Sequence, residues 1–207
     1  MDERLALPAV GDCHTVVLVE GLSDKAALEA LARRHGRDLG ADGVAVVAMG
    51  GAQAIGRFLE LFGPRGRNLG LAGLCDAPEE ADFKRGLERA GLGTSLTREG
   101  LEALGFFVCV EDLEDELIRA LGPEAVEEVV AAEGELHRFR TFQNQPAWRG
   151  RPVEDQLRRF MKTYSGRAIR VAARLTEALD PAHVPRPLAG VLAYVSGPAA
   201  AADEAVV

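Results

Sequence analysis

The sequence predicts an α/β protein, built on a four-stranded parallel sheet flanked by helices and followed by a helical region. Four short apolar runs, rich in β-branched residues, are each followed after a turn by apolar residues at helical spacing. Repeated strand and helix units of this length give parallel strands with right-handed crossovers. After Gly122 the strand patterns stop, and helical patterns separated by Gly and Pro follow.

The first predicted strand, Val16 to Val19, ends on Glu20. Ser23 stands where it can cap the next helix, predicted over 23–35. Ligands of open parallel sheets bind at the carboxyl ends of the strands, so Glu20 lies at the edge where chemistry is expected. Asp24, in the first helical turn, can face the same crevice.

The remaining predicted strands cover 43–49, 69–76 and 106–110. The predicted helices are one with Ile55, Phe58, Leu59 and Phe62 on one face, then 79–91, 97–104, 123–133, 135–142, 152–162 and 165–179. We assign 14–122 to a sheet domain, 123–195 to a basic helical appendage and 196–207 to a disordered tail.

A double glycine, Gly50 and Gly51, separates the second strand from its helix. Such a loop can bring backbone N–H groups close to a phosphate. The surrounding residues match neither GxGxxG nor GxxxxGK[ST], which favours a tight turn instead.

The composition is that of an ordinary globular protein, with 47% hydrophobic and 27% charged residues among 207. No apolar run is long enough for a membrane span, and the start lacks the pattern of a signal peptide, so we expect a cytoplasmic protein that does not contact a membrane. The histidines and cysteines show no zinc-type spacing. Any metal would be held by carboxylates, which favours Mg²⁺ or Mn²⁺.

The charge of the chain is divided unevenly. The net charge is −8, but the segment 135–175 has ten basic and three acidic residues, which makes it +7 and the remainder −15. A basic stretch that also contains aromatic residues suits nucleic acid, with DNA as the expected partner. The predicted contacts are Arg149, Arg151, Arg158, Arg159 and Arg167, with Trp148 as a stacking platform. The alternative is a solvated helical face with its aromatics in the core.

The run Val-Glu-Gly-Leu-Ser-Asp at 19–24, with a later strand that ends in Leu74-Cys75-Asp76, resembles a TOPRIM domain, and most of all that of the OLD family of nucleases. The resemblance implies a Rossmann-like sheet whose acidic cluster holds Mg²⁺ for making or breaking phosphodiester bonds. It also implies that the first and third strands are neighbours, so that Glu20 and Asp76 share one crevice. OLD proteins usually carry an ATPase domain before this part, which leaves open a separate ATPase partner, and a homodimer is also left open.

The same resemblance supplies further candidate residues. OLD-like domains carry an acid after the fourth strand, and Asp112 and Glu114 are the best match here. The implied metal ligands are therefore Glu20, Asp24, Asp76, Glu114 and Asp112. OLD-like nucleases also place a lysine from the helical region near the metal, and Lys162 is the candidate. Its ammonium would offset charge on the scissile phosphate.

One position departs from the family. TOPRIM domains typically have Asp-x-Asp at the third strand, where this chain has Asp76-Ala77-Pro78. The missing second aspartate puts one ligand, or one of two metals, in question. Glu79 or Glu80 can supply it, or both are simply first-turn helix acids. Asp76 itself can be read as a helix cap before a proline.

Together these features predict a TOPRIM-type Mg²⁺-dependent endonuclease or nucleotidyl hydrolase that cleaves DNA, with Glu20, Asp76 and Lys162 as catalytic residues. Two alternatives stay open. One is a catalytically degenerate module that binds nucleic acid or a partner. The other is a nucleotidyl transferase or phosphohydrolase that acts on small nucleotides. The sequence does not decide between DNA and RNA, or between endo- and exonucleolytic action.

Overall fold

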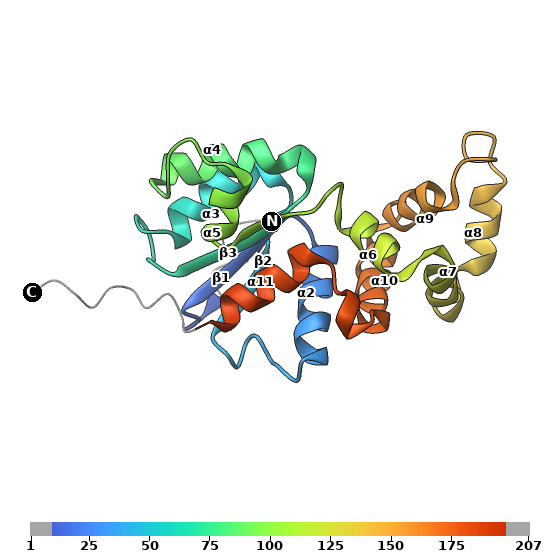
Figure 1. Ribbon diagram of the computed structural model, residues 1–207, viewed down its shortest axis with the longest axis horizontal. Helices are drawn as coiled ribbons and strands as arrows, with labels where there is room; N and C mark the ends of the chain where they lie inside the picture. The colour runs from blue at the N-terminus through green and yellow to red at the C-terminus, as the bar shows by residue number, and fades with distance from the viewer. Residues whose placement is uncertain (1–9, 198–207) are drawn as a thin grey trace, which may run out of the picture.

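A four-stranded parallel sheet with the strand order β2-β1-β3-β4 organises the protein (Figure 1). The computed structural model describes residues 10–197. The strands are β1 (Thr15–Val19), β2 (Val44–Ala48), β3 (Gly70–Cys75) and β4 (Phe106–Val108). The four predicted parallel strands are confirmed. Of the tail predicted to be disordered, residues 198–207 lie outside the described part of the chain.

The strand register places the functional edge. Val17 in the central strand β1 pairs with Val46 of β2 and with Ala72 of β3, and β1 is buried throughout. Because β1 and β3 are direct neighbours and parallel, their carboxyl ends meet at one edge of the sheet. Glu20 and Asp76 are the residues that follow these two strand ends.

One face of the sheet is covered by α3 (Ile55–Phe62) and α4 (Glu80–Ala90), with α5 (Arg98–Ala103) beside β4. Short 3₁₀ turns, η1 (Ala52–Ala54) and η2 (Ala77–Glu79), precede α3 and α4. Side chains alternate between the faces of a strand, and Val16 and Leu18 point to this side. They pack with Phe58, Phe62 and Phe83, which are fully buried.

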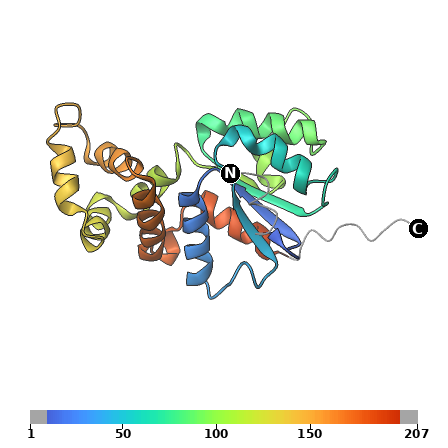
Figure 2. The ribbon, with the colours of Figure 1, turned by 180° about the vertical axis from the view of Figure 1, so that it is seen from behind.

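The opposite face is covered by α2 (Leu22–Arg34) and α11 (Arg186–Ser196). Figure 2 shows α11, in red, lying against the sheet. A side chain at Gly190 would collide with the ring of Phe107, so glycine allows the helix to approach β4 closely. Our prediction had no separate helix here and assigned these residues to the appendage, whereas α11 lies on β3 and β4.

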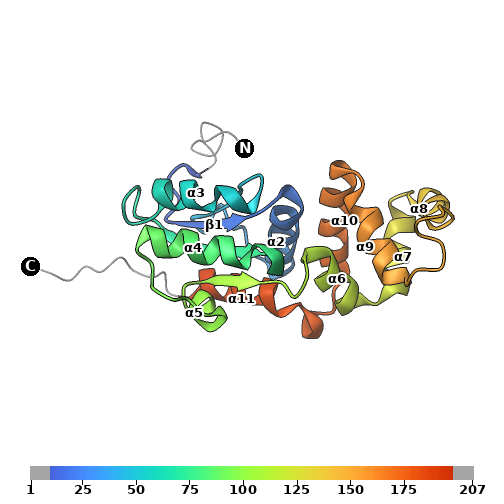
Figure 3. The same ribbon diagram turned by 90° about the horizontal axis from the view of Figure 1, so that it is seen from above.

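The helical region consists of α6 (Leu113–Leu121), α7 (Pro123–Ala132), α8 (Leu136–Gln143), α9 (Val153–Lys162) and α10 (Ser165–Ala178), with the turn η3 (Pro181–His183) before α11. Helix α10 packs along α2, while α7 and α8 lie farthest from the sheet (Figure 3). The apolar core under α2 continues without a break into this region. The predicted helices of this region are confirmed, and the domain boundary at residue 122 stays a prediction.

Two details complete the fold. The N-cap of α2 is Gly21 and not Ser23, so the predicted serine cap is wrong. The N–H of Gly21 instead donates to the carboxylate of Asp24 at 2.7 Å, because Asp24 stands three residues into the helix and reaches back to its start. No helix in residues 10–197 has the length and apolar character that a membrane crossing requires.

Candidate metal centre at the carboxyl edge of the sheet

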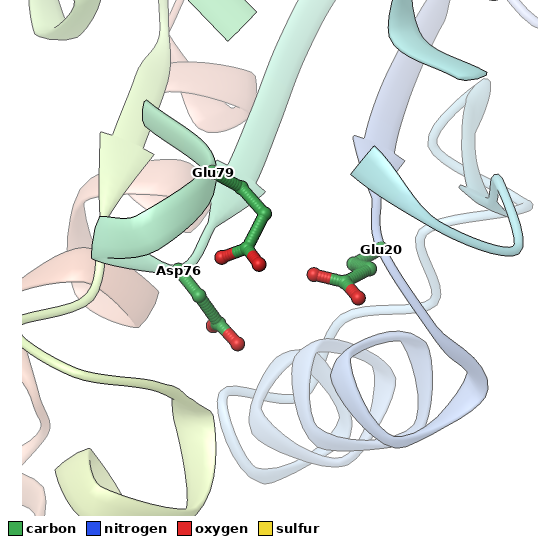
Figure 4. Close-up of side chains that lie close together, drawn as sticks. All are labelled: Glu20, Asp76 and Glu79. Atoms are coloured by element: carbon green, nitrogen blue, oxygen red, sulfur yellow. The ribbon is translucent and has the colours of Figure 1, made fainter. Parts of the chain in front are cut away.

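Three carboxylates converge where β1 and β3 end. Glu20 follows β1, Asp76 follows β3, and Glu79 closes the turn η2. One oxygen atom of each side chain lies within 4.8 Å of one from each of the others. Figure 4 shows the three side chains directed into one space between the two strand ends. The separation suits a shared cation, since hard oxygen ligands from neighbouring strands are how proteins hold Mg²⁺.

The backbone at Glu20 is held by the double glycine after β2. The carbonyl oxygen of Glu20 accepts hydrogen bonds from the N–H groups of Gly50, at 2.9 Å, and of Gly51, at 3.2 Å. Gly51 has φ of 130°, a conformation that L side chains rarely adopt. The two N–H groups are therefore used within the protein, in agreement with the tight turn that the sequence favours.

The turn η2 decides which acid joins the cluster. Asp76 precedes η2, but its side chain caps none of the N–H groups there, so a capping role does not explain it. Glu79 turns toward Glu20, whereas the next residue, Glu80, pairs with Lys84 at 2.6 Å and with Arg98. Glu79 thus stands where the missing second aspartate of Asp-x-Asp would have provided a ligand.

The electrostatics of this cluster indicate an unbalanced negative charge. Burial, together with the neighbouring Asp24 carboxylate, raises the pKa of Asp76 to about 8. Burial and the Glu79 carboxylate likewise raise the pKa of Glu20. Oxygen Oε2 of Glu20 and Oε2 of Glu79 are both buried without a hydrogen-bond partner. A buried unpaired carboxylate oxygen is costly, and a divalent cation would satisfy it, so these residues fit Mg²⁺.

Asp24 lies behind this cluster and is buried. Burial raises its pKa to about 7, against the opposing hydrogen bond from the Gly21 N–H and with the support of the nearby Glu114 carboxylate. Its carboxylate is not one of the three that converge at the cluster. The structure therefore brings Asp24 beside Asp76 but directs one of its oxygens to the helix start.

Asp112, Glu114 and Lys162 form a second group beside the cluster. Asp112 caps α6 by accepting from the N–H of Asp115 at 2.8 Å. Its other oxygen accepts from Lys162 at 2.6 Å and from Arg158 at 2.7 Å. Burial alone would raise the pKa of Asp112, but these hydrogen bonds outweigh it and lower the pKa. Lys162 also lies 3.3 Å from the buried carboxylate of Glu114, whose pKa burial raises.

The rest of the acidic run at 111–116 is neutralised by arginines and a backbone donor. Glu111 lies 3.6 Å from Arg158, and Arg119 pairs with Asp115 and with Glu116. Glu116 also accepts from the N–H of Val110 at 2.7 Å. Five acids can follow one another here because cations from α9 and from α6 itself surround them.

The predicted nucleic-acid residues divide into exposed and internal ones. Arg149, Arg151 and Arg159 are exposed, and Arg158 is partly buried. Arg167 is 7% exposed and pairs with Glu135 at 3.0 Å, because α10 begins against the start of α8. Its predicted surface role is therefore wrong.

Trp148 is partly buried and already engaged within the protein. Its ring stacks on Phe142 with centroids 5.2 Å apart, and Arg151 lies over it at 4.9 Å. The predicted base-stacking role of Trp148 stays a prediction.

The fold and this edge geometry are shared with known proteins. Residues 13–74 match the family described as overcoming lysogenization defect protein-like, TOPRIM domain. The chain contains an OLD-like TOPRIM domain. The OLD-like TOPRIM domain belongs to a family of metal-dependent nucleases, and the acidic cluster lies at the end of the matched segment and just beyond it. A comparison with curated proteins gives no match.

Solved structures of OLD proteins have the same fold over most of the chain. The C-terminal region of the OLD protein of Burkholderia pseudomallei superposes with a TM-score of 0.68 at 20% identity, covering 88% of this chain and 97% of that one. The C-terminal region of the OLD protein of Xanthomonas campestris pv. campestris gives 0.65 at 23% identity, covering 89% and 94%. The similarity extends past the TOPRIM domain into the helical region.

Proposed function

We propose that this chain is a Mg²⁺-dependent nuclease that hydrolyses phosphodiester bonds in DNA. The observation that supports it best is the convergence of Glu20, Asp76 and Glu79 at the carboxyl edge of an OLD-like TOPRIM sheet. Two of these side chains have buried oxygens without a partner, as expected of ligands that wait for a cation.

Glu20, Asp76 and Glu79 would hold the metal. Bound there, Mg²⁺ or Mn²⁺ would neutralise charge on the phosphate and favour ionisation of an attacking water. Asp24 and Glu114, both buried beside the cluster, are proposed as further ligands. Asp112 is a less direct one, since its free oxygen already binds Lys162 and Arg158.

Lys162 is placed to act on the substrate from the other side of the cluster. Its ammonium is partly exposed, with 38% of the side chain accessible. Burial opposes its charge, but Glu114 and Asp112 outweigh this and raise its pKa, so Lys162 is fully protonated at neutral pH. A fixed positive charge there would offset the charge that builds on a phosphate in the transition state.

The exposed arginines of the helical region would hold the flanking DNA. Arg158 lies one helical turn from Lys162 on α9, and Arg149, Arg151 and Arg159 are near it in the chain. Phosphate contacts of this kind position a nucleic acid without reading its sequence. A separate ATPase partner and a homodimer stay predictions.

The test is cleavage of supercoiled plasmid and of single-stranded DNA by purified protein with Mg²⁺, Mn²⁺ or EDTA. Glu20→Gln and Asp76→Asn keep the shape of each side chain and remove its charge. We expect metal-dependent cleavage that both variants lose. A wild type that is inert with every metal but binds DNA would instead support the binding module, and cleavage of free nucleotides alone would support the small-molecule alternative.

A further inference from the structure

A cleft adjoins the acidic cluster on the side of α3. It has a volume of about 570 Å³, and Glu20 and Glu79 form part of its wall. The rest of the wall comes from 50–54 together with Arg57 and Asp82. Ligand pockets of proteins have volumes of roughly 300 to 1,000 Å³, so the cleft is large enough for a nucleotide unit. It therefore offers a seat directly next to the proposed metal ligands.

The glycine loop gives this cleft a wall without side chains. A Cβ atom at Gly51 would meet nothing within 4 Å, so the backbone there borders open space. The N–H groups of Gly50 and Gly51 are already donated to the carbonyl of Glu20. The loop consequently cannot bind a phosphate through these two groups, and side chains have to provide the polar contacts.

The charges of the lining side chains single out Arg57. Glu20 and Glu79 would be neutralised by the metal, and Asp82 pairs with Arg85. Arg57 is the one cationic residue that lines the cleft in residues 10–197, and both it and Gln53 are exposed. Arginine suits a phosphate because its guanidinium presents several donors to the oxygens.

We propose that this cleft binds the nucleotide next to the scissile phosphate, with Arg57 on the outer phosphate of that nucleotide and Gln53 on its sugar or base. The inference rests on the proposed nuclease function. It gives the substrate a path, because the acidic cluster lies between this cleft and Lys162 at the end of α9 (Figure 3). A strand held by the helical region would cross the metal ligands and enter the cleft.

The test compares Arg57→Ala, Arg57→Lys and Gln53→Trp with wild type. Arg33→Ala is the matched control, since Arg33 is an exposed arginine in the last turn of α2. Binding of a fluorescent single-stranded oligonucleotide is followed by anisotropy in Ca²⁺ over a series of salt concentrations. Each lost phosphate contact on a single strand lowers the slope of log K against log salt by about 0.7. Mn²⁺ affinity, measured by calorimetry, is the readout for the metal ligands.

We expect Arg57→Ala to weaken binding roughly tenfold and to lower the salt slope by about 0.7, while Mn²⁺ affinity stays unchanged. Arg57→Lys should restore the slope, Gln53→Trp should block the cleft, and Arg33→Ala should match wild type. Wild-type slope and affinity in Arg57→Ala and Gln53→Trp would overturn the proposal and leave the nuclease function standing. Competition by mononucleotides at the same strength as by oligonucleotides would overturn the polymer path. Absence of cleavage by wild type would refute the nuclease function alone.

Discussion

The ammonium nitrogen of Lys162 lies 2.6 Å from Oδ2 of Asp112, although the two residues are 50 positions apart in the chain. Asp112 starts α6 just after β4, and Lys162 ends α9. This contact fastens the helical region to the edge of the sheet where the acidic cluster lies. The basic and acidic parts of the sequence therefore meet at the proposed site.

Replacement of Lys162 by methionine should slow DNA cleavage by about two orders of magnitude or more, because a fixed charge next to the scissile phosphate is lost. Metal affinity should persist, since Glu20, Asp76 and Glu79 are intact. Single-turnover rates at saturating Mg²⁺ measure the effect. Lys84→Met is the control, as Lys84 pairs with Glu80 away from the cluster. Cleavage at the wild-type rate by Lys162→Met would remove Lys162 from the mechanism.

Glu79 and Glu80 form a matched pair of neighbours. Glu79→Gln should weaken Mn²⁺ binding by at least about tenfold and reduce cleavage, because it removes one of three converging carboxylates. Glu80→Gln should leave both unchanged, since Glu80 binds Lys84 and Arg98 instead. Calorimetric titration with Mn²⁺ separates the two. Equal metal affinities in the two variants would show that Glu79 does not replace the missing aspartate.

The stability of the metal-free protein should fall as the pH rises. The pKa values of Asp24, about 7, and Asp76, about 8, both lie above the ordinary 3.8, so the folded protein retains protons that the unfolded chain has released. The free energy of unfolding therefore falls between about pH 4 and pH 8. Thermal midpoints in EDTA should show this fall, Mg²⁺ should reverse it at pH 8, and Asp76→Asn should reduce it. A midpoint that rises over this range would contradict the prediction.

Arg167 and Arg159 should behave in opposite ways. Arg167→Met leaves Glu135 buried without its partner and should lower the free energy of unfolding by about 3 kcal/mol. Arg159→Ala removes an exposed charge and should leave stability within about 0.5 kcal/mol of wild type while it weakens DNA binding in a salt-dependent way. Urea unfolding and anisotropy distinguish the two. A stable Arg167→Met protein with weakened DNA binding would restore the surface role of Arg167.

Local pattern was enough to predict the sheet. Each strand is a short apolar run with a turn after it, and the carboxyl ends of parallel strands meet at one edge. Hence Glu20 and Asp76 could be placed together before any coordinates. Lys162 and Asp112 came from family resemblance, because nothing in their spacing indicates that they are neighbours.

The remaining details depend on tertiary packing. The direction of Glu79 rather than Glu80 follows from the short turn η2, whose two adjacent acids look equivalent in the sequence. Arg167 reads as one more surface arginine until α8 is seen to supply Glu135. Helix α11 lacks a clear signal because it contains Gly190 and begins with Arg and Pro, and only its contact with Phe107 explains the glycine.

Helix α11 also has a consequence for how the chain is made. It covers β3 and β4, strands that are synthesised about 80 to 110 residues before it. On a ribosome the chain emerges from its N-terminus, so one apolar side of these strands stays uncovered until residues 186–196 leave the exit tunnel. Segments that expose apolar surface in this way are prone to associate with other chains. Completion of the sheet, and with it of the edge that holds Glu20 and Asp76, is thus one of the last events of biosynthesis.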